Sequence, residues 1–185
     1  MDQKFYELKV AGCTRQLPIC KVNDVISIAA FIMFSDVEIT IACAEELLKK
    51  APDFDVIVTA EAKGIPLAYE MARQSGKQYI ACRKMSKLYM TDPVMVEVQS
   101  ITTARKQTLY LDKHEMDYLN GKKVLIVDDV ISTGGSLYAL ESIVNKAGGN
   151  IVGKAAVLAE GVASERSDII YLELLPTFNT KDYFN

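Results

Sequence analysis

A short apolar run followed by two aspartates and a glycine-rich turn constrains the fold of this chain more than any other feature. Val124–Val127 is uninterrupted and apolar, which predicts a strand that is buried on both faces of a sheet. Asp128 and Asp129 come next, at the carboxyl end of that strand, where open α/β sheets bind ligands. The turn over residues 132–136 then leads into Leu137–Val144, whose apolar spacing is helical.

The turn carries residue types that suit a phosphate monoester. Its glycines allow a tight bend that points backbone N–H groups inward, its hydroxyls add donors, and the following helix contributes the positive end of its dipole. The candidate phosphate ligands are Ser132, Thr133, Gly134, Gly135 and Ser136. The two carboxylates beside them suit sugar hydroxyls or a Mg²⁺ shell instead. A phosphate next to a diol describes a ribose 5-phosphate.

Each half of this stretch also has a plain structural interpretation. A strand that ends in two aspartates occurs in receiver domains and nucleotide hydrolases, and a Gly-Gly turn commonly opens a helix. No G-x-x-x-x-G-K-[ST] sequence is present, which excludes a Walker A loop. Joined at this spacing, the halves resemble the phosphoribosyl pyrophosphate (PRPP) motif of type I phosphoribosyltransferases. The resemblance covers about residues 18–178 and is closest to the purine branch.

The resemblance implies a pentosyltransferase of purine salvage, which moves a 5-phosphoribosyl group from PRPP to a purine base and releases pyrophosphate. It implies an α/β fold with a doubly wound, mainly parallel sheet flanked by helices. The alternation of strand and helix patterns favours the same fold. We expect a single domain over residues 1–185, with its core at about 36–160 and a small hood built from about 1–35 and 161–185.

The resemblance also implies roles for individual residues. Asp128 and Asp129 would contact the ribose hydroxyls and stabilise an oxocarbenium-like transition state, and Glu97 or a nearby hydroxyl would assist at the base. Glu61-Ala62-Lys63-Gly64 resembles the pyrophosphate loop of adenine phosphoribosyltransferases, with lysine in place of arginine. Such loops often carry a non-proline cis peptide. Pyrophosphate would be held by Glu61, Ala62, Lys63, Gly64, Arg83, Lys84 and Lys87.

Arg83, Lys84 and Lys87 could also form a solvated basic turn. Their place at the same sheet edge as the two anion loops favours pyrophosphate binding instead. We expect Mg²⁺ as the cofactor, carried by PRPP, with no metal held by a direct cluster of protein ligands. The family resemblance, together with the apolar stretches Val25–Phe34 and Lys84–Val96, indicates a homodimer.

Four positions bear on the identity of the base. Oxopurine enzymes usually place a lysine after the strand that follows the motif helix, and Glu160 stands there. An ionised carboxylate cannot donate to a ring carbonyl, which favours adenine, whereas Lys154 or a backbone N–H of the hood is the alternative donor for an oxopurine. Cys20 and Ser27 fall where xanthine-type hoods contact the base. The alternatives are a xanthine or other oxopurine phosphoribosyltransferase and a non-catalytic regulator of this fold that senses PRPP or purines.

Apolar patterns assign the remaining segments. Residues 1–25 are expected to be irregular, because Gly12 and Pro18 interrupt them, and Val25–Phe34 is a strand or a buried segment. Asp36 predicts the N-cap of a helix over Val37–Lys50.

Further along, Met95–Ser100 and Gln107–Leu111 read as the strands of a hairpin, and Ile101–Lys106 between them resembles the loop that covers PRPP. The polar stretch Asp112–Glu115, which contains the single histidine, is expected to be a solvated loop.

Composition excludes several classes of protein. The chain of 185 residues has a net charge of −3, which gives no general affinity for nucleic acid. It has no apolar run long enough to span a bilayer and no signal-peptide pattern, so we expect a cytoplasmic protein that binds no membrane. The four cysteines form no C-x-x-C pair, which argues against a metal site and favours reduced thiols.

Overall fold

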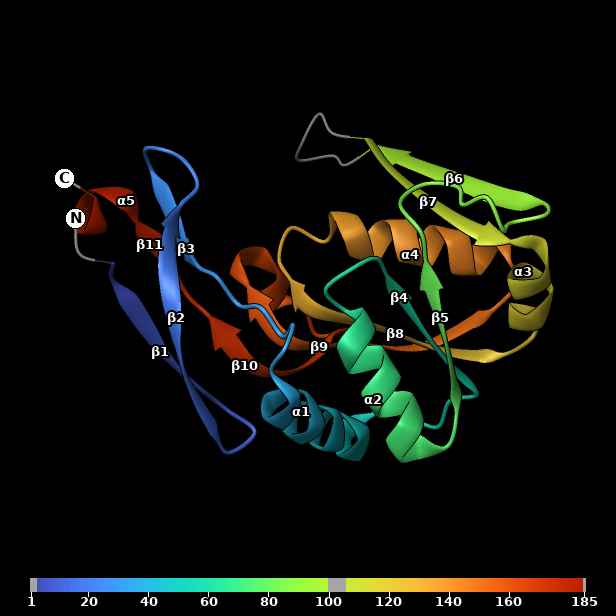
Figure 1. Cartoon of the computed structure of the whole chain (residues 1–185), viewed down its shortest axis with the longest axis horizontal. Coiled ribbons are helices and arrows are strands. Elements are labelled where there is room, and N and C mark those ends of the chain that lie inside the picture. Colours follow the sequence, from blue (N-terminus) through green and yellow to red (C-terminus); the bar gives the residue numbers. More distant parts are fainter. Residues whose placement is uncertain (1–2, 100–105, 185) are drawn as a thin grey trace.

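The centre of the molecule, a computed structural model that describes residues 3–99 and 106–184, is a parallel sheet of five strands (Figure 1). Its order is β10-β9-β8-β4-β5, and all neighbouring strands run parallel. The strands are β4 (Val56–Ala60), β5 (Gln78–Cys82), β8 (Lys123–Ile131), β9 (Asn150–Glu160) and β10 (Ile170–Leu175). The predicted fold class is therefore confirmed.

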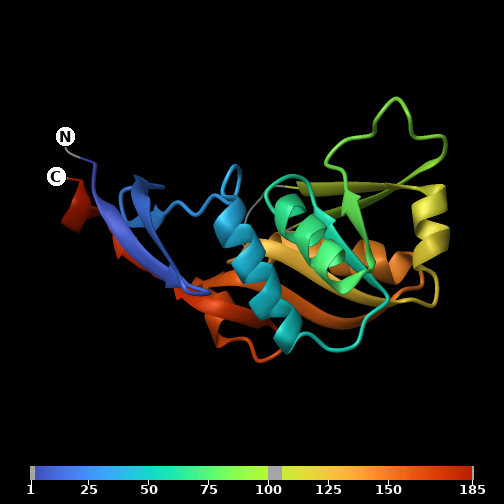
Figure 2. The ribbon, with the colours of Figure 1, turned by 60° about the horizontal axis from the view of Figure 1, so that its bottom comes forward.

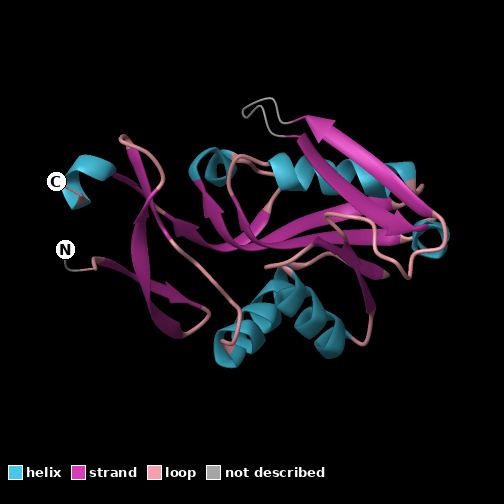
Figure 3. Ribbon diagram, turned by 45° about the horizontal axis from the view of Figure 1, so that its top comes forward, coloured by secondary structure: helices cyan, strands magenta, loops and turns pink. Residues whose placement is uncertain are grey.

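Helices cover both faces of this sheet. On one face lie α1 (Val37–Lys50) and α2 (Ile65–Ser75), and on the other lie α3 (Lys113–Leu119) and α4 (Gly135–Lys146) (Figure 3). Side chains alternate along β4, so that Val58 packs with α3 and α4 while Ile57 packs with α1 and α2. Burial on both faces explains why the strands read as continuous apolar runs. Among the described residues, no helix is long and apolar enough to cross a membrane.

An antiparallel hairpin of β6 (Pro93–Gln99) and β7 (Lys106–Asp112) lies over α4, as Figure 1 shows. The two strands agree with the hairpin expected from the sequence. The loop expected to cover PRPP lies outside the described residues, except for its last residue, which begins β7.

The hood is a separate antiparallel sheet at one end of the core, and both ends of the chain meet in it (Figure 2). Its order is β1-β2-β3-β11, formed by β1 (Phe5–Val10), β2 (Cys13–Lys21), β3 (Ile26–Ala29) and β11 (Thr177–Asn179), and α5 (Thr180–Tyr183) follows. After β9, the chain passes through the 3-10 helix η1 (Gly161–Glu165) and then forms β10 before it enters the hood. Because β10 belongs to the core sheet, the hood takes only β11 and α5 from the carboxyl-terminal part of the chain.

The expectation that residues 1–25 are irregular is wrong. Leu8, Leu17 and Ile19 are buried at alternating positions of a regular hairpin, and Gly12 has a φ of 76° in its turn. Gly12 is thus a hairpin turn rather than a break in structure. The following apolar stretch forms strand only over β3, and beyond it Ile32 and Phe34 are exposed.

The junction of hood and core is held at the start of α1. Asp36 caps this helix as predicted, because its carboxylate accepts from the backbone N–H of Ile39 at 3.2 Å. The guanidinium of Arg15 on β2 donates to both oxygens of the same carboxylate, at 2.6 and 2.9 Å. The pKa of Asp36 is held below its usual range, mainly by this hydrogen bond with Arg15.

The stretch Asp112–Glu115 was expected to be a loop, and this is wrong. Asp112 is the N-cap of α3, and Glu115 accepts from the Asp112 backbone N–H at 2.9 Å, which completes a capping box. The Asp112 carboxylate also accepts from the backbone N–H groups of Thr91 and Asp92, at 3.2 and 3.1 Å. The aspartate therefore holds the segment before β6 against the start of α3.

The sheet topology fixes where a ligand can bind. The chain leaves β4 toward β5 on one side and returns to β8 on the other, so β4 and β8 flank the point at which strand order reverses. Their pairing ends at Val58 and Ile126, after which the two strands diverge. A crevice at the carboxyl ends of two such strands is the usual ligand site of an open α/β sheet.

Candidate active site

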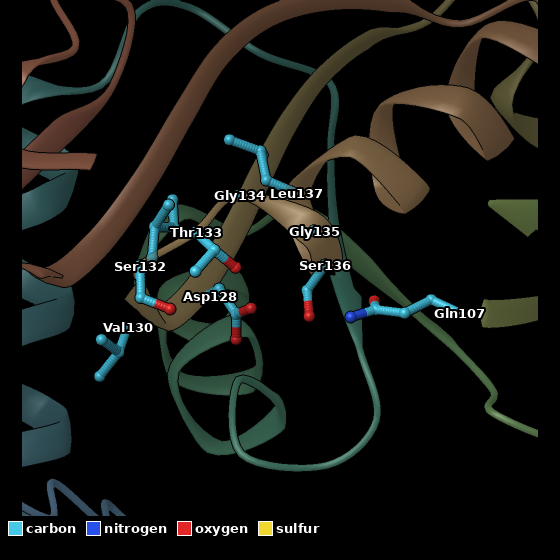
Figure 4. A pocket seen from close by; sticks show the side chains of 10 residues that line it. Gln107, Asp128, Val130, Ser132, Thr133, Gly134, Gly135, Ser136 and Leu137 are labelled. Carbon is cyan, nitrogen blue, oxygen red and sulfur yellow. The ribbon is translucent and has the colours of Figure 1, made fainter. Parts of the chain in front are cut away.

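The turn between β8 and α4 forms a polar pocket of about 190 Å³. Figure 4 shows the hydroxyl side chains of Ser132, Thr133 and Ser136 around it, with Asp128 beside them and the Gln107 amide on the far side. Gly134 has a φ of 80°, and α4 starts there with no side-chain cap among the described residues. The first N–H groups of the helix therefore lack an intrahelical acceptor and suit an anion.

The five residues proposed from the sequence as phosphate ligands all line this pocket. Gln107, on β7, was not identified from the sequence. Its place depends on how the hairpin lies across the core, and no local motif signals that.

The two aspartates lie within β8 rather than after it, and they differ in environment. Asp129 is 2% exposed, and its carboxylate binds the ammonium of Lys63 at 2.7 Å. Asp128 lines the phosphate pocket, and its carboxylate accepts from the Asp129 backbone N–H at 2.9 Å. Burial, followed by the negative charge of Asp129, raises the pKa of Asp128. The Asp128 carboxylate thus lies beside the pocket, and the Asp129 carboxylate holds the β4–α2 loop through Lys63.

The β4–α2 loop approaches β8 closely. The peptide bond between Glu61 and Ala62 is cis, as the resemblance implied. A Cβ atom on Gly64 would overlap the Thr59 hydroxyl and would lie 2.9 Å from Oδ1 of Asp128. Only glycine lets the β4–α2 loop approach β8 this closely, so Gly64 fixes the width of the crevice.

Two cationic side chains, those of Arg83 and Lys87, lie beside Glu61 of this loop. Glu61 accepts from the Lys84 backbone N–H at 3.0 Å, and its carboxylate lies 3.4 Å from Lys87 Nζ and 3.7 Å from a guanidinium nitrogen of Arg83. The pKa of Glu61 is lowered, first by the Lys84 N–H and then by the Lys87 ammonium. Glu61 thus anchors the basic segment that contains Arg83, Lys84 and Lys87 to the β4–α2 loop. A carboxylate would itself repel a phosphate.

A second pocket of about 320 Å³ adjoins the phosphate pocket, and the two share Val130 and Ser132 in their linings. Its walls are Ile28–Ile32 of the hood and Leu175 of β10. Among the described residues its charged groups are Lys63 and Glu160, and burial raises the pKa of Glu160. Oε1 of Glu160 is buried with no hydrogen-bond partner among the described residues. The paired pockets thus suit a phosphorylated ligand with a part that fits mostly apolar walls.

The other proposed base contacts lie elsewhere. Ser27 is fully buried inside the hood, where its hydroxyl binds the Thr180 hydroxyl at 2.9 Å. Cys20 is exposed on β2, opposite Ile28. Glu97 is exposed on β6, opposite Thr108. In the described part of the chain, none of the three is among the residues that line either pocket.

The protein alone offers little to a metal ion. Over residues 3–99 and 106–184, no group of three histidine, cysteine or acidic side chains could hold one. Asp129 is already engaged by Lys63, which leaves Asp128 as the carboxylate beside the phosphate pocket. Such a donor set fits a Mg²⁺ ion that takes most of its ligands from a bound phosphate compound and water.

Comparison with known proteins gives a consistent result. The family model of the phosphoribosyl transferase domain matches residues 37–181. Adenine phosphoribosyltransferase of Petrotoga mobilis is 33% identical over 130 residues, which are 70% of this chain and 71% of that protein. Hypoxanthine/guanine phosphoribosyltransferase of Methanothermococcus okinawensis is 39% identical over 61% of this chain and 58% of its own.

Among solved structures, adenine phosphoribosyltransferase from Thermoanaerobacter pseudethanolicus superposes with a TM-score of 0.65 at 25% identity. The superposition covers 77% of this chain and 84% of that one.

Proposed function

This chain belongs to the phosphoribosyltransferase family, and from that premise we propose that it transfers the 5-phosphoribosyl group of PRPP to adenine, giving the nucleoside monophosphate and pyrophosphate. The observation that carries the proposal is the pair of adjoining pockets, one polar at a helix N-terminus and one largely apolar under the hood. A phosphate, a ribose and a purine in sequence would occupy them without a break.

Different groups of residues would bind different parts of the substrate. The N–H groups and hydroxyls of residues 132–136 would bind the 5-phosphate, and the carboxylates of β8 would contact the ribose hydroxyls. Their negative charge stabilises the positive charge that develops on the sugar as its bond to pyrophosphate breaks. Lys63, Arg83 and Lys87 lie at or beside the β4–α2 loop, and together with Lys84 they would bind the pyrophosphate as it leaves. Mg²⁺ bound with PRPP would neutralise negative charge on that leaving group.

Adenine fits the second pocket better than an oxopurine does. Position 6 of adenine carries an amine, which donates hydrogen bonds, and Glu160 offers a partly buried acceptor. Lys154, the alternative donor for a ring carbonyl, is engaged elsewhere. Its ammonium binds Asp168 at 2.8 Å and also the carboxylate of Glu141. An oxopurine would place its carbonyl against a carboxylate and lose a hydrogen bond.

The expected result of a pyrophosphate-release assay is activity with PRPP, Mg²⁺ and adenine, at a kcat/KM well above that for hypoxanthine, guanine or xanthine. A site built for one hydrogen-bond pattern can reject the other by about 10⁴-fold. A kcat/KM for any oxopurine above that for adenine would show an oxopurine site, with the PRPP assignment intact. No pyrophosphate release with any base would refute the transferase proposal.

We also propose that the protein is a homodimer, held in part by the apolar surface near the start of α1. Ile32, Phe34, Val37 and Tyr69 are all about half exposed or more there, which is unusual for so many large apolar side chains in one region. In the other apolar stretch noted in the sequence, Met85 and Leu88 are exposed too.

Sedimentation should therefore show a dimer at micromolar concentration, and Val37→Asp should shift it toward monomer. An acidic residue suits the first turn of a helix, so this change should not weaken α1 itself. Val162→Asp places the same charge at an exposed position elsewhere and should leave the dimer intact. A wild-type protein that stays monomeric would contradict the proposal.

A further inference from the structure

Glu160 is an unusual residue for the wall of an apolar pocket. It is the last residue of β9, paired with Leu175 of β10, and it stands one strand away from the phosphate turn, since Ala159 pairs with Ile131 of β8. Its Oε1 atom is shielded from solvent and has no hydrogen-bond partner among the described residues. A buried polar atom without a partner costs about 1–3 kcal/mol, so such an atom needs an explanation.

In the described part of the chain, the carboxylate of Glu160 forms no ion pair. The hood presents Ile28–Ile32, β10 presents Leu175, and β8 with its turn presents Val130 and Ser132. Among the described residues, the one cation in this lining is Lys63, whose ammonium is bound by Asp129 at 2.7 Å. Burial raises the pKa of Glu160 and the charge of Lys63 opposes this rise. A carboxylate in such a place is a stronger proton acceptor than one in water.

The proposed reaction needs a proton acceptor beside the purine base, in the pocket that contains Glu160. A neutral purine carries one proton on its imidazole ring, and that proton must leave once a ring nitrogen becomes bonded to the sugar. Glu97, the acid suggested for this task from the sequence, is not among the described residues of the pocket lining. We propose that Glu160 is the catalytic residue that accepts the imidazole proton of the base. This inference rests on the proposed function.

The base binds with its proton on N7 and its 6-amine on the same edge, so the two oxygens of the Glu160 carboxylate accept one hydrogen bond from each. N9 forms a bond to C1′ of the ribose, and the bond from C1′ to pyrophosphate breaks, its electron pair leaving with the pyrophosphate oxygen. The N7 proton passes to Glu160, which later returns it to solvent. An oxopurine presents a carbonyl beside N7–H, so the same carboxylate would repel it.

The test compares two bases in single-turnover experiments, which isolate the chemical step from product release. One is adenine, and the other is 8-azaadenine, whose triazole N–H is more acidic and needs less help to depart. For Glu160→Gln, we expect the rate with adenine to fall by about 100-fold or more, the usual contribution of a positioned base. With 8-azaadenine, the loss should be below about tenfold, since a better acid depends less on the acceptor.

Glu165→Gln is the matched control, because Glu165 is an exposed glutamate in the adjacent η1 helix and should change neither rate. Calorimetry should show the same PRPP affinity in Glu160→Gln as in wild type, which establishes an intact site. Equal losses with both bases would overturn the inference, because Glu160 would then only position the base, and no loss with adenine would overturn it as well. A wild-type protein that fails to bind PRPP would refute the proposed function instead, so the two failures are distinguishable.

Discussion

Replacing Gly134 with valine is expected to weaken PRPP binding by about 100-fold or more, which corresponds to about 2.8 kcal/mol. Gly134 has a φ of 80°, where a side chain costs about 1–2 kcal/mol in backbone strain. Relief of that strain would turn the N–H groups at the start of α4 away from the pocket. Each hydrogen bond to a charged group contributes about 1.5–3 kcal/mol, so the loss of one or two suffices. Titration calorimetry with PRPP measures the effect.

Gly76→Val is the matched control for this change. Gly76 has a similar φ of 69° at the end of α2, and no atom lies within 4 Å of the position of its missing Cβ. It should lower the free energy of unfolding by a similar strain and leave the PRPP dissociation constant unchanged. If Gly134→Val bound PRPP as tightly as the wild type, the turn would not be part of the phosphate site.

Gly64→Ala is expected to lower kcat/KM by about 100-fold, because a misplacement of about 1 Å at a site can have this effect. The added methyl group would overlap the Thr59 hydroxyl and lie 3.3 Å from Cα of Asp128, so the β4–α2 loop must move away from β8. The pyrophosphate cations and the ribose carboxylates would then no longer fit one substrate. Steady-state kinetics of the folded variant measure the effect.

Gly149→Ala separates this effect from plain destabilisation. A methyl group there would lie 2.9 Å from Cγ1 of Val144 and 3.0 Å from Cγ2 of Val124, which is similar crowding at a place far from the crevice. Both variants should unfold at lower temperature, but only Gly64→Ala should lose activity per folded molecule. Normal kinetics in Gly64→Ala would mean that the width of the crevice is not critical.

Local patterns predicted the core well because each of its signals lies within a few consecutive residues. The apolar run before Asp128, the N-cap at Asp36 and the glycine turn at Gly134 all specify structure without distant partners. The capping box at Asp112 is equally local, since an aspartate stands three residues before a glutamate. That signal was overlooked in a stretch of high polarity, although the sequence contains it.

Features that depend on tertiary packing could not be predicted in the same way. The position of Gln107 beside the phosphate pocket requires the hairpin to lie over α4. The burial of Ser27 requires α5 to return beside β3, and the ion pair of Lys63 with Asp129 joins the β4–α2 loop to β8, which are adjacent only in the folded sheet. Glu160 was placed near the base by resemblance, but its unpartnered oxygen is visible only in three dimensions.

The hood brings together residues that are far apart along the chain. Strand β3 pairs with β11, and the hydrogen bond of Ser27 with Thr180 joins residues 153 positions apart. In the core, by contrast, β4 pairs with β5 and β8 pairs with β9 across a single helix. Closing the longer loop costs more chain entropy, so these long-range contacts are expected to form last. During folding, the phosphate turn would then be in place before the wall that encloses the base.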